Sequence, residues 1–478
     1  MRVEPLGKIA PIDAFKAIRG LEQPFLFEGG GGGGSDGGGW YTYAGAEPSL
    51  IIKTDVAGTT VTVRYGAPPS PSIASPDKAR GQDPFETLSE ILGSSRPGVQ
   101  GPFPFNGGVV GYFAYDLKDR LFEGRNSSER REKGLGLPEC VLGIYPTVYV
   151  YDHMKKEGFL VSQETVTEQY KRIKGLVSSP RPDKAASADA ALPGPLYAMR
   201  SNVTRPQYMD SIKRAKEYIS AGDIYQINIS QRLELPFPHG DGLTLYDRLA
   251  AANPTPFGSF MDFGSFQLIS NTPERLLKVK GRVMETSPIK GTRPRGKTPA
   301  EDQSLVEELK ASPKERAEHV MIVDLERNDL GKVSVTGSVE VVEFEKIETF
   351  THLHHMVSTV RATVREGLDS VECLKAAFPG GSVTGAPKIR AMEIIDELET
   401  VPRGVYTGGI GWVDFSGDMD FSMAIRTAVY KEGVVYLHVG GGIVADSVPE
   451  EEYEETILKA RDFMEALGGE PFSGGEPF

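Results

Sequence analysis

Strand-like and helix-like segments follow one another along this chain without the regular strand–helix–strand order of a parallel sheet. Runs rich in Val, Ile and Tyr predict strands at Val141–Tyr151, Val333–Phe344, Gly408–Phe415 and Val434–Val439. This irregular mixing favours an α+β fold over a doubly wound sheet. The chain has 478 residues, so it accommodates two domains or one large compound domain.

Three segments carry the signals of helices. Thr204 and Gln207 form a capping-box pattern, and Gly222 is the expected stop of that helix. Two more helices are predicted at Lys388–Leu398 and Glu450–Leu467. Apolar side chains expected on the buried faces are Met209, Ile212, Ala215 and Ile219 in the first helix, and Ile389, Met392, Ile395 and Leu398 in the second.

Two segments have the composition of flexible connections. Residues 29–39 are nearly all glycine, and residues 176–195 are rich in Pro, Ser and Ala. The glycine run matches GxGxxG only by composition, because no strand pattern precedes it and no helix pattern follows. We therefore expect an N-terminal region at 1–175, a linker at 176–195, a second region at 196–467 and a disordered tail at 468–478, although strands of both regions can share a sheet.

Charge and cysteine content exclude several classes of function. The formal net charge is −13, which repels phosphate backbones and argues against nucleic-acid binding. No run approaches 18 apolar residues, and Met1–Ile18 has no signal-peptide core, so we expect neither a membrane span nor secretion. Cys140 and Cys373 have no CxxC spacing. We expect a reduced, cytoplasmic protein.

Two pairs of glutamates have the spacing of neighbours on one helix face. They are Glu315 with Glu318, and Glu452 with Glu455. Carboxylates converging from two helices would suit Mg²⁺, which prefers hard oxygen ligands and keeps bound water. The alternative is that both pairs simply face solvent.

Two glycine-rich segments could bind an anion. In Phe378–Lys388 small residues precede a helix, so exposed backbone N–H groups could hold a carboxylate or phosphate. This is not a Walker A loop, because Gly385 is followed by Ala386. Gly440–Gly442 would also let a ligand approach the backbone closely. A tight turn and a bend after a strand are the structural alternatives.

A histidine cluster and one lysine are further candidates. His352, His354 and His355 lack the spacing of helical zinc sites, which leaves a single acid–base histidine or structural roles. Lys290 lies in PIKG, a turn-forming segment of low polarity. Partial loss of solvent there would favour its neutral, nucleophilic form, and an ordinary surface lysine is the alternative.

Several longer motifs occur in a fixed order, densely from about residue 200 to 460 and more weakly before that. They are PFNGGVVGYFAYD (104–116), TRPQYMDSIKRAKEYISAGDIYQINISQR (204–232), TPER (272–275), PIKGTRPRG (288–296), ERAEHVMIVDLERNDLG (315–331), HHMVSTV (354–360), PGGSVTGAPKIRAMEIID (379–396), YTGGIGW (406–412), MAIRTA (423–428) and GGGIVADSVPEEEYEETILKA (440–460). Through these motifs and their order, the chain resembles the chorismate-utilising enzymes. This family includes component I of anthranilate synthases and of aminodeoxychorismate synthases.

The resemblance implies an α/β sandwich of two packed sheets with outer helices, in which 196–467 is the chorismate-binding catalytic region. It implies that Glu318 and Glu455 bind Mg²⁺ and that Glu315 and Glu452 assist through water.

The same resemblance implies roles around the substrate. Glu274 would be the acid–base group, and His355 would lie near the reacting carbons. Residues implied in binding the substrate are Ser382, Tyr406, Arg426, Gly440, Gly441, Gly442 and Lys459, with Lys388 as a supporting cation.

Two positions separate the activities within this family. The PIKGT form, with Lys290, resembles aminodeoxychorismate synthases, whereas anthranilate synthases usually show PIAGT. Gln226 stands where isochorismate and salicylate synthases carry a water-activating lysine, so it argues against both. The resemblance then implies an aminodeoxychorismate synthase of p-aminobenzoate and folate biosynthesis, in which the Lys290 amine adds at C2 of chorismate and ammonia replaces it at C4.

Ammonia would come from a partner. Neither Cys140 nor Cys373 has the glycine-flanked elbow of a glutaminase nucleophile, so a separate glutamine amidotransferase subunit is implied. PFLFEGGGGGG replaces the LLES-type segment that binds tryptophan in anthranilate synthases, which argues against tryptophan binding here. The alternatives are anthranilate synthase component I and a non-catalytic chorismate-binding subunit.

Overall fold

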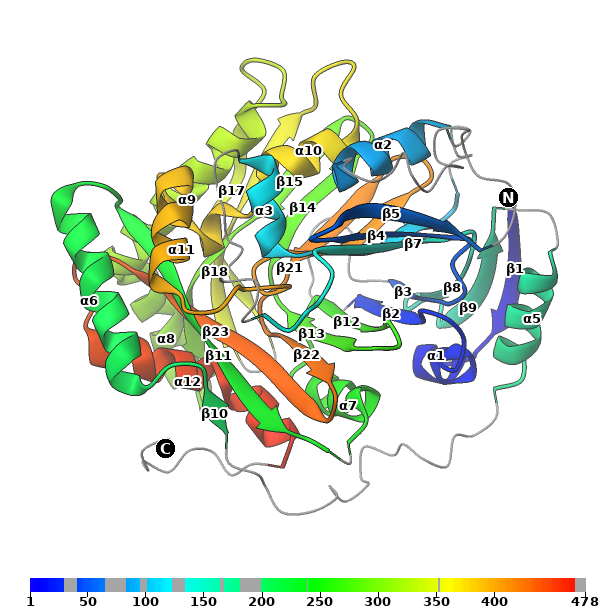
Figure 1. Ribbon diagram of the computed structural model, residues 1–478, viewed down its shortest axis with the longest axis horizontal. Helices are drawn as coiled ribbons and strands as arrows, with labels where there is room; N and C mark the ends of the chain where they lie inside the picture. The colour runs from blue at the N-terminus through cyan, green and yellow to red at the C-terminus, as the bar shows by residue number, and fades with distance from the viewer. Residues whose placement is uncertain are drawn as a thin grey trace.

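Two large antiparallel sheets with helices on their outer sides make up the protein (Figure 1), which confirms the predicted α+β sandwich. The computed structural model describes residues 1–29, 41–64, 83–94, 101–122, 134–163, 167–180, 199–238, 240–350 and 353–468. His352, nearly all of the glycine run, most of the expected linker and the tail beyond residue 468 lie outside these ranges.

Each sheet combines strands from the N-terminal and the second region of the chain. The twelve-stranded sheet contains, in spatial order, β1 (Arg2–Gly7), β9 (Glu157–Ser162), β8 (Thr147–Asp152), β3 (Tyr41–Gly45), β2 (Phe25–Gly29), β12 (Phe257–Asp262), β13 (Gln267–Thr272), β22 (Thr427–Lys431), β23 (Val434–Ile443), β11 (Gln226–Pro236) and β10 (Arg200–Ser201), with β19 (Gly385–Ala386) on β11. The eleven-stranded sheet contains β16 (Ile289–Pro294), β18 (Leu353–Thr363), β15 (Val283–Ser287), β14 (Arg275–Lys280), β21 (Met419–Met423), β20 (Gly409–Asp414), β6 (Gly108–Phe113), β7 (Cys140–Tyr145), β4 (Leu50–Asp55) and β5 (Gly58–Val63), with β17 (Glu340–Thr349) on β18.

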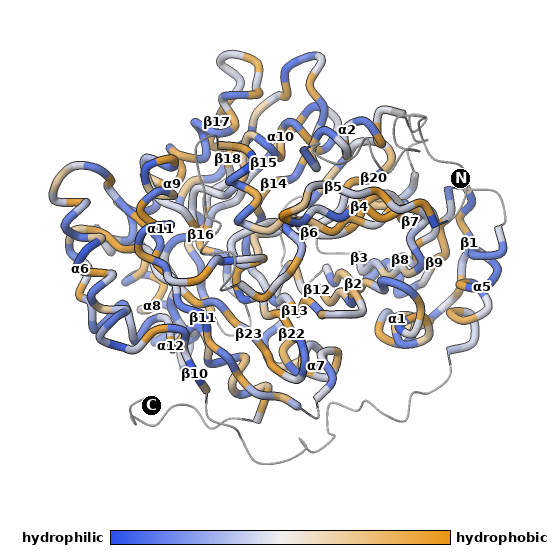
Figure 2. Tube along the Cα trace, viewed as in Figure 1, coloured by the Kyte–Doolittle hydropathy of each residue, from blue (hydrophilic) through white to orange (hydrophobic). Residues whose placement is uncertain are grey.

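The helices cover the outer faces of both sheets. They are α1 (Pro11–Ile18), α2 (Pro84–Ser94), α3 (Lys118–Leu121), α5 (Glu168–Val177), α6 (Arg205–Ala221), α7 (Gly242–Ala252), α8 (Pro299–Ala311), α9 (Pro313–Gly331), α10 (Ser370–Ala377), α11 (Lys388–Leu398) and α12 (Pro449–Ala466), with short 3₁₀ turns at η1 (Tyr115–Leu117) and η2 (Gly381–Val383). Strands around β4 and β7 are strongly hydrophobic, whereas α5 and α6 expose hydrophilic residues (Figure 2).

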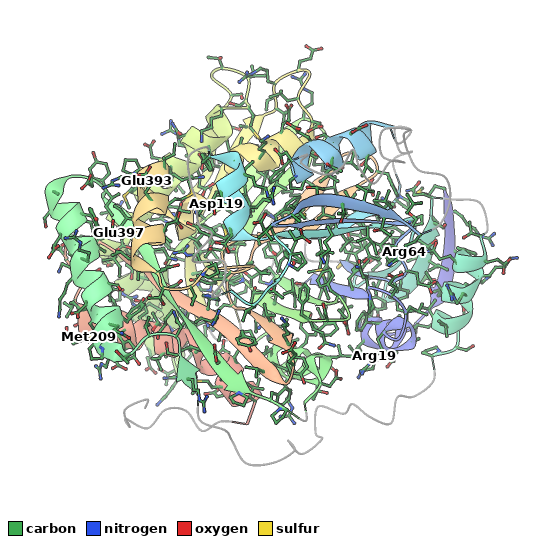
Figure 3. The ribbon with its side chains drawn as sticks, in the orientation of Figure 1. Arg19, Arg64, Asp119, Met209, Glu393 and Glu397 are labelled. Atoms are coloured by element: carbon green, nitrogen blue, oxygen red, sulfur yellow. The ribbon has the colours of Figure 1, made fainter. Side chains whose placement is uncertain are left out.

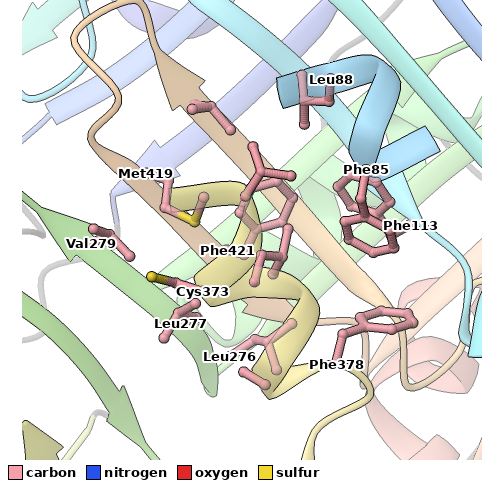
Figure 4. Close-up of a cluster of buried hydrophobic side chains, with 14 of the residues drawn as sticks. Phe85, Leu88, Phe113, Leu276, Leu277, Val279, Cys373, Phe378, Met419 and Phe421 are labelled. Carbon is pink, nitrogen blue, oxygen red and sulfur yellow. The ribbon is translucent and has the colours of Figure 1, made fainter. Parts of the chain in front are cut away.

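The hydrophobic core is layered in the same way as the sheets. One cluster lies between them, and others lie under the helices on each outer side. Under α2 and α10, Phe85 stacks on Phe113 at 4.7 Å between ring centroids, close to Phe421 and Cys373 (Figure 4). Burial of aromatic side chains on both outer sides and between the sheets holds the sandwich together.

The chain crosses from one sheet to the other at several places, and two of these crossovers are neighbours in space. Glu274 lies between β13 and β14, and Arg426 lies between β21 and β22. These crossovers are hydrogen-bonded to each other: the Asn271 N–H donates to the Arg426 carbonyl at 3.0 Å, and the Met423 N–H donates to the Glu274 carbonyl at 2.9 Å. Two predicted site residues therefore lie where the sheets join.

Local helix signals were reliable guides to the ends of helices. The Thr204 side chain accepts from the Gln207 N–H in a complete capping box, and Gly222 ends α6 with φ 83°. The range Lys388–Leu398 is confirmed as α11. Ile389, predicted on its buried face, is instead 53% exposed, because Ala391 and Ile394 pack inward beside Met392 and Ile395. Glu393 and Glu397 lie on the outer face of this helix (Figure 3).

Two of the predicted strands were wrong in extent. Val141–Tyr151 is not one strand, because Pro146 lacks an N–H and separates β7 in one sheet from β8 in the other. The strand predicted at Val333–Phe344 begins only at Glu340, since Gly337, with φ 81°, turns the chain before it.

Candidate active site

Glu274 is a buried carboxyl group at the junction of the two sheets. It is 5% exposed, and the Ser382 hydroxyl donates to its Oε1 atom at 2.6 Å. Burial raises the pKa of Glu274 to about 7, against the opposing effects of the Ser382 hydrogen bond and the Lys290 charge. A carboxyl group with this pKa can hold or release a proton near neutral pH.

Lys290 and Gln226 both approach Gly442 on β23. This strand contains Gly440–Gly442 and is called the glycine strand. A Cβ atom at Gly442 would lie 2.6 Å from the Gln226 Nε2 atom and 3.5 Å from the Lys290 Nζ atom. Gln226 is buried, and its Oε1 atom has no hydrogen-bond partner among the described residues. Lys290 is half-buried on β16. Any side chain at position 442 would therefore fill the space between these two groups.

The glycines of Gly440–Gly442 belong to a regular strand. They continue β23, where Gly440 pairs with Ser230 and Gly442 pairs with Asn228 on β11, so the alternative of a bend after the strand does not apply to these residues. A Cβ atom at Gly440 would lie 2.8 Å from the hydroxyl oxygen of Tyr406. Their lack of side chains lets side chains of other elements approach a regular strand closely, and it does not serve a turn.

The carboxylates of α12 lie against the middle glycine. A Cβ atom at Gly441 would lie 3.2 Å from Glu452 Oε2 and 3.8 Å from Glu455 Oε1. Lys459 bridges this group, because its ammonium donates to the Gly440 carbonyl at 2.8 Å and pairs with Glu455 at 2.6 Å. Five predicted residues of the α12 and glycine segments are thus brought together.

The second glutamate pair lies on α9, beside the strand that carries Lys290. Glu315 pairs with Arg293 at 3.4 Å, and a Cβ atom at Gly291 would lie 3.2 Å from Glu315 Oε2. Glu318 is half-buried on the same helix. Within the described ranges, no three His, Cys, Asp or Glu side chains are grouped closely enough to hold a metal ion by themselves.

The described histidines of the cluster have different surroundings. His355 is buried on β18, where its Nδ1 atom shares a hydrogen bond of 2.9 Å with the Thr292 hydroxyl. Burial and the Arg426 charge lower the pKa of His355 to about 4, so its ring is neutral at pH 7. His354 instead links Asp302 at 2.9 Å and Thr349 at 2.9 Å, which is a structural arrangement.

Tyr406 and Arg426 are two further predicted site residues. The Tyr406 ring stacks on His438 at 5.4 Å between ring centroids. Arg426, in a left-handed conformation with φ 49°, donates to the Lys459 carbonyl at 2.9 Å. Lys388 differs from what its implied role as a supporting cation requires: it is buried, pairs with Asp329 and donates to the Pro379 carbonyl at 2.7 Å.

Sequence reasoning missed two buried charged groups near the site. Arg403 is 1% exposed and donates to Glu399 at 2.8 Å and to the Asn228 and Val383 carbonyls. Glu326 lies on α9 inside the ERAEHVMIVDLERNDLG motif and is 2% exposed. Alternation of polar and apolar residues gave no sign of their burial, because their partners come from distant segments.

The chain belongs to the chorismate binding enzyme family, whose model matches residues 36–465. It is 40% identical to anthranilate synthase component 1 of Aquifex aeolicus (strain VF5), over 81% of this chain and 79% of that protein. It is also 40% identical to aminodeoxychorismate synthase component 1 of Escherichia coli (strain K12), over 80% of this chain and 83% of that protein. The crystal structure of anthranilate synthase component I from Streptococcus pneumoniae TIGR4 superposes with a TM-score of 0.75 at 30% identity, covering 89% of this chain and 92% of that one. This is a chorismate-utilising enzyme, and the residues above line its candidate site.

None of the helices that the structure describes is long and apolar enough to cross a membrane.

Proposed function

We propose that this enzyme converts chorismate and ammonia to 4-amino-4-deoxychorismate. The proposal rests on the position of Lys290. Its ammonium approaches Gly442 beside Gln226, and its charge acts on the buried Glu274. Relatives with either activity are equally similar at 40% identity, so overall similarity does not choose between them. An amine directed into the site favours a covalent route to the 4-amino product.

The first chemical step uses two of these residues. The Lys290 amine forms a bond to C2 of chorismate, the C1=C2 and C5=C6 double bonds shift to C1=C6 and C4=C5, and the C4–O bond breaks. Glu274, whose pKa is raised to about 7 by burial, donates its proton so that the C4 oxygen leaves as water. Ammonia then bonds to C4, both double bonds shift back to C5=C6 and C1=C2, and the C2–N bond breaks to release the lysine amine.

In this proposal, polar and charged side chains around the glycine strand bind the substrate. Arg426, Tyr406 and Lys459 supply cationic and hydrogen-bonding partners for its two carboxylates, and Ser382 orients Glu274. The neutral His355 contributes a hydrogen bond without adding a positive charge beside Lys290.

We infer that the carboxylates of α9 and α12 bind Mg²⁺, an ion that prefers hard oxygen donors. Glu315 lies close to Gly291 on β16, and Glu452 and Glu455 lie close to Gly441 on β23. Glu318 and Glu455 would hold the ion, with Glu315 and Glu452 binding through water. When bound, the ion supplies positive charge for a substrate carboxylate. Substrate and water would complete its coordination.

Ammonia is supplied by a glutamine amidotransferase subunit in this proposal. Cys140 and Cys373 are both buried, and burial raises the pKa of the Cys373 thiol to about 12. Burial also holds the pKa of Cys140 well above its ordinary value. Neither thiol can serve as the thiolate nucleophile that releases ammonia from glutamine.

Product analysis tests the proposal. The full chain is incubated with chorismate, Mg²⁺ and ammonium, with and without an added aminodeoxychorismate lyase, and the products are separated and identified by mass. We expect p-aminobenzoate only when the lyase is present. Anthranilate and pyruvate as the main products would overturn the assignment in favour of anthranilate synthase, and binding of chorismate without any product would favour a non-catalytic subunit.

A further inference from the structure

Glu326 is a buried carboxyl group with one oxygen left without a partner. It lies in the second half of α9 and is 2% exposed. Its Oε1 atom accepts a hydrogen bond from the Gly381 N–H at 3.2 Å. Its Oε2 atom is buried and has no hydrogen-bond partner among the described residues. Burying a carboxyl oxygen without a hydrogen-bond partner costs free energy of folding, so we looked for a functional reason for a glutamate at position 326.

Glu326 is joined to Glu274 through two consecutive residues. Gly381 donates its N–H to Glu326, and the next residue, Ser382, donates its hydroxyl to Glu274 at 2.6 Å. The absence of a side chain at Gly381 allows this contact, because a Cβ atom there would lie 2.6 Å from Leu325 and 3.1 Å from Glu326 Oε1. The η2 turn therefore connects two buried carboxyl groups: Gly381 binds Glu326, and Ser382 binds Glu274.

The charges around the pair come from several elements. Asp329 on α9 and Glu274 between β13 and β14 disfavour a negative charge on Glu326, and Lys388 on α11 favours it. Lys388 itself is held by Asp329, which offsets much of its effect. Burial and the Asp329 charge raise the pKa of Glu326 to about 7, the same range as that of Glu274. Around Glu274, Lys290 and Lys459 act in the opposite direction.

We propose that Glu326 is a positioning residue that forms a coupled carboxyl pair with Glu274 through Gly381–Ser382. The pair holds one proton between its two carboxyl groups, so that Glu274 keeps a proton for departure of the C4 hydroxyl at higher pH than it would alone. This proposal rests on the acid role of Glu274 in the proposed function. Two carboxyl groups that are close in a dry site lose their protons in two separate steps, and the second step is moved to higher pH. Glu326 touches no substrate in this arrangement.

The test compares Glu326→Gln with Glu274 left intact. Glutamine keeps the acceptor for the Gly381 N–H but removes the charge. Asp324→Asn is the matched control, because Asp324 lies on the same helix with an exposed side chain paired to Arg327 at 3.0 Å. Rates of chorismate consumption are measured from pH 6 to 9, so that the result does not depend on which product forms.

In Glu326→Gln we expect the alkaline limb of the kcat profile to move to lower pH by about one unit, with KM for chorismate unchanged. The Asp324→Asn profile should match that of the unmodified chain. A Glu326→Gln profile that also matches it would overturn the proposal and leave Glu326 as an acceptor for the loop. An equal change in KM and kcat without a shift in pH would overturn it as well.

A second measurement covers the case in which Glu326→Gln does not fold or the chain consumes no chorismate. Infrared absorption of protonated carboxyl groups is followed against pH in the unmodified chain and in Glu274→Gln. Coupling between two groups is reciprocal. In Glu274→Gln the titration of the remaining buried carboxyl group, Glu326, should therefore move to lower pH by a similar amount. A titration that does not move would contradict the pair, whereas absent turnover alone would count only against the proposed function.

Discussion

Glu274 is surrounded by groups with opposite effects on its proton. Burial raises its pKa to about 7, while the Ser382 hydroxyl and the Lys290 charge favour the carboxylate. In the unfolded chain the same carboxyl group would titrate near 4.5. The folded state therefore binds one proton more than the unfolded state between these two pH values, and stability falls as pH rises through that window.

The variant Glu274→Gln should be inactive yet more stable at alkaline pH. Loss of a general acid typically lowers kcat by about 10² to 10⁴-fold. Above pH 7 the variant should gain up to about 3 kcal/mol in the free energy of unfolding relative to the unmodified chain, and little at pH 4.5. Urea unfolding at several pH values measures this, and a constant difference across pH would contradict the raised pKa.

Lys290 is the second residue on which the proposed chemistry depends. Lys290→Ala should lower formation of 4-amino-4-deoxychorismate by at least about 10³-fold, because the nucleophile is lost. Lys290→Arg should fail too, since a guanidinium stays protonated. Lys297→Ala, an exposed lysine a few residues further on, is the control and should behave normally.

Mass spectrometry of the unmodified chain with chorismate and no ammonia should reveal an adduct on the peptide that contains Lys290. Undiminished turnover by Lys290→Ala would instead favour direct addition of ammonia.

At the scale of elements, α9 and α12 present glutamates to the Lys290 strand and the glycine strand. Glu318→Gln and Glu455→Gln should each raise the Mg²⁺ concentration needed for half-maximal activity by tens of fold, because each removes a charged ligand. Glu454→Gln, which alters an exposed glutamate paired with Arg205 on the same helix as Glu455, is the control. Titration of activity with Mg²⁺ checks this, and identical curves for all three variants would mean that these pairs only face solvent.

The end of α11 is fixed by the Arg403–Glu399 pair. Arg403→Leu leaves Glu399 buried beside the Ser230 backbone without its cation, and should lower the free energy of unfolding by about 3–5 kcal/mol. Arg390→Leu, which breaks the exposed pair with Glu393, should cost less than about 1 kcal/mol. Urea unfolding of both variants measures the two free-energy changes. Equal decreases in the free energy of unfolding would show that burial does not increase the contribution of the Arg403–Glu399 pair to stability.

Elements with strong local signals could be predicted from the sequence, and contacts between distant segments could not. The capping box at Thr204 and the stop at Gly222 are properties of neighbouring residues, and both are confirmed. The burial of Glu326 depends on Gly381, which is 55 positions away, and the engagement of Lys388 depends on Asp329. Motif order therefore located the candidate site, but only the packing of α9 against η2 could reveal the second carboxyl group.

At the scale of the whole molecule, strands of both regions share both sheets, so the candidate site belongs to a single sandwich. The described thiols are buried and cannot release ammonia from glutamine. We expect the purified chain to use ammonium but not glutamine, and to use glutamine once a glutaminase subunit is added. Glutamine-dependent turnover by the chain alone, in a preparation free of amidotransferases, would contradict this.

The two hydrogen-bonded crossovers tie the geometry of the site to the stacking of the sheets. The same peptide groups that fasten β13–β14 to β21–β22 belong to Glu274 and Arg426. A small shear of one sheet over the other would therefore change the separation of this acid and this cation before any strand lost its pairing. Side chains packed between the sheets, such as Phe105 and Tyr112, oppose such a shear because they fill the space that the sheets share.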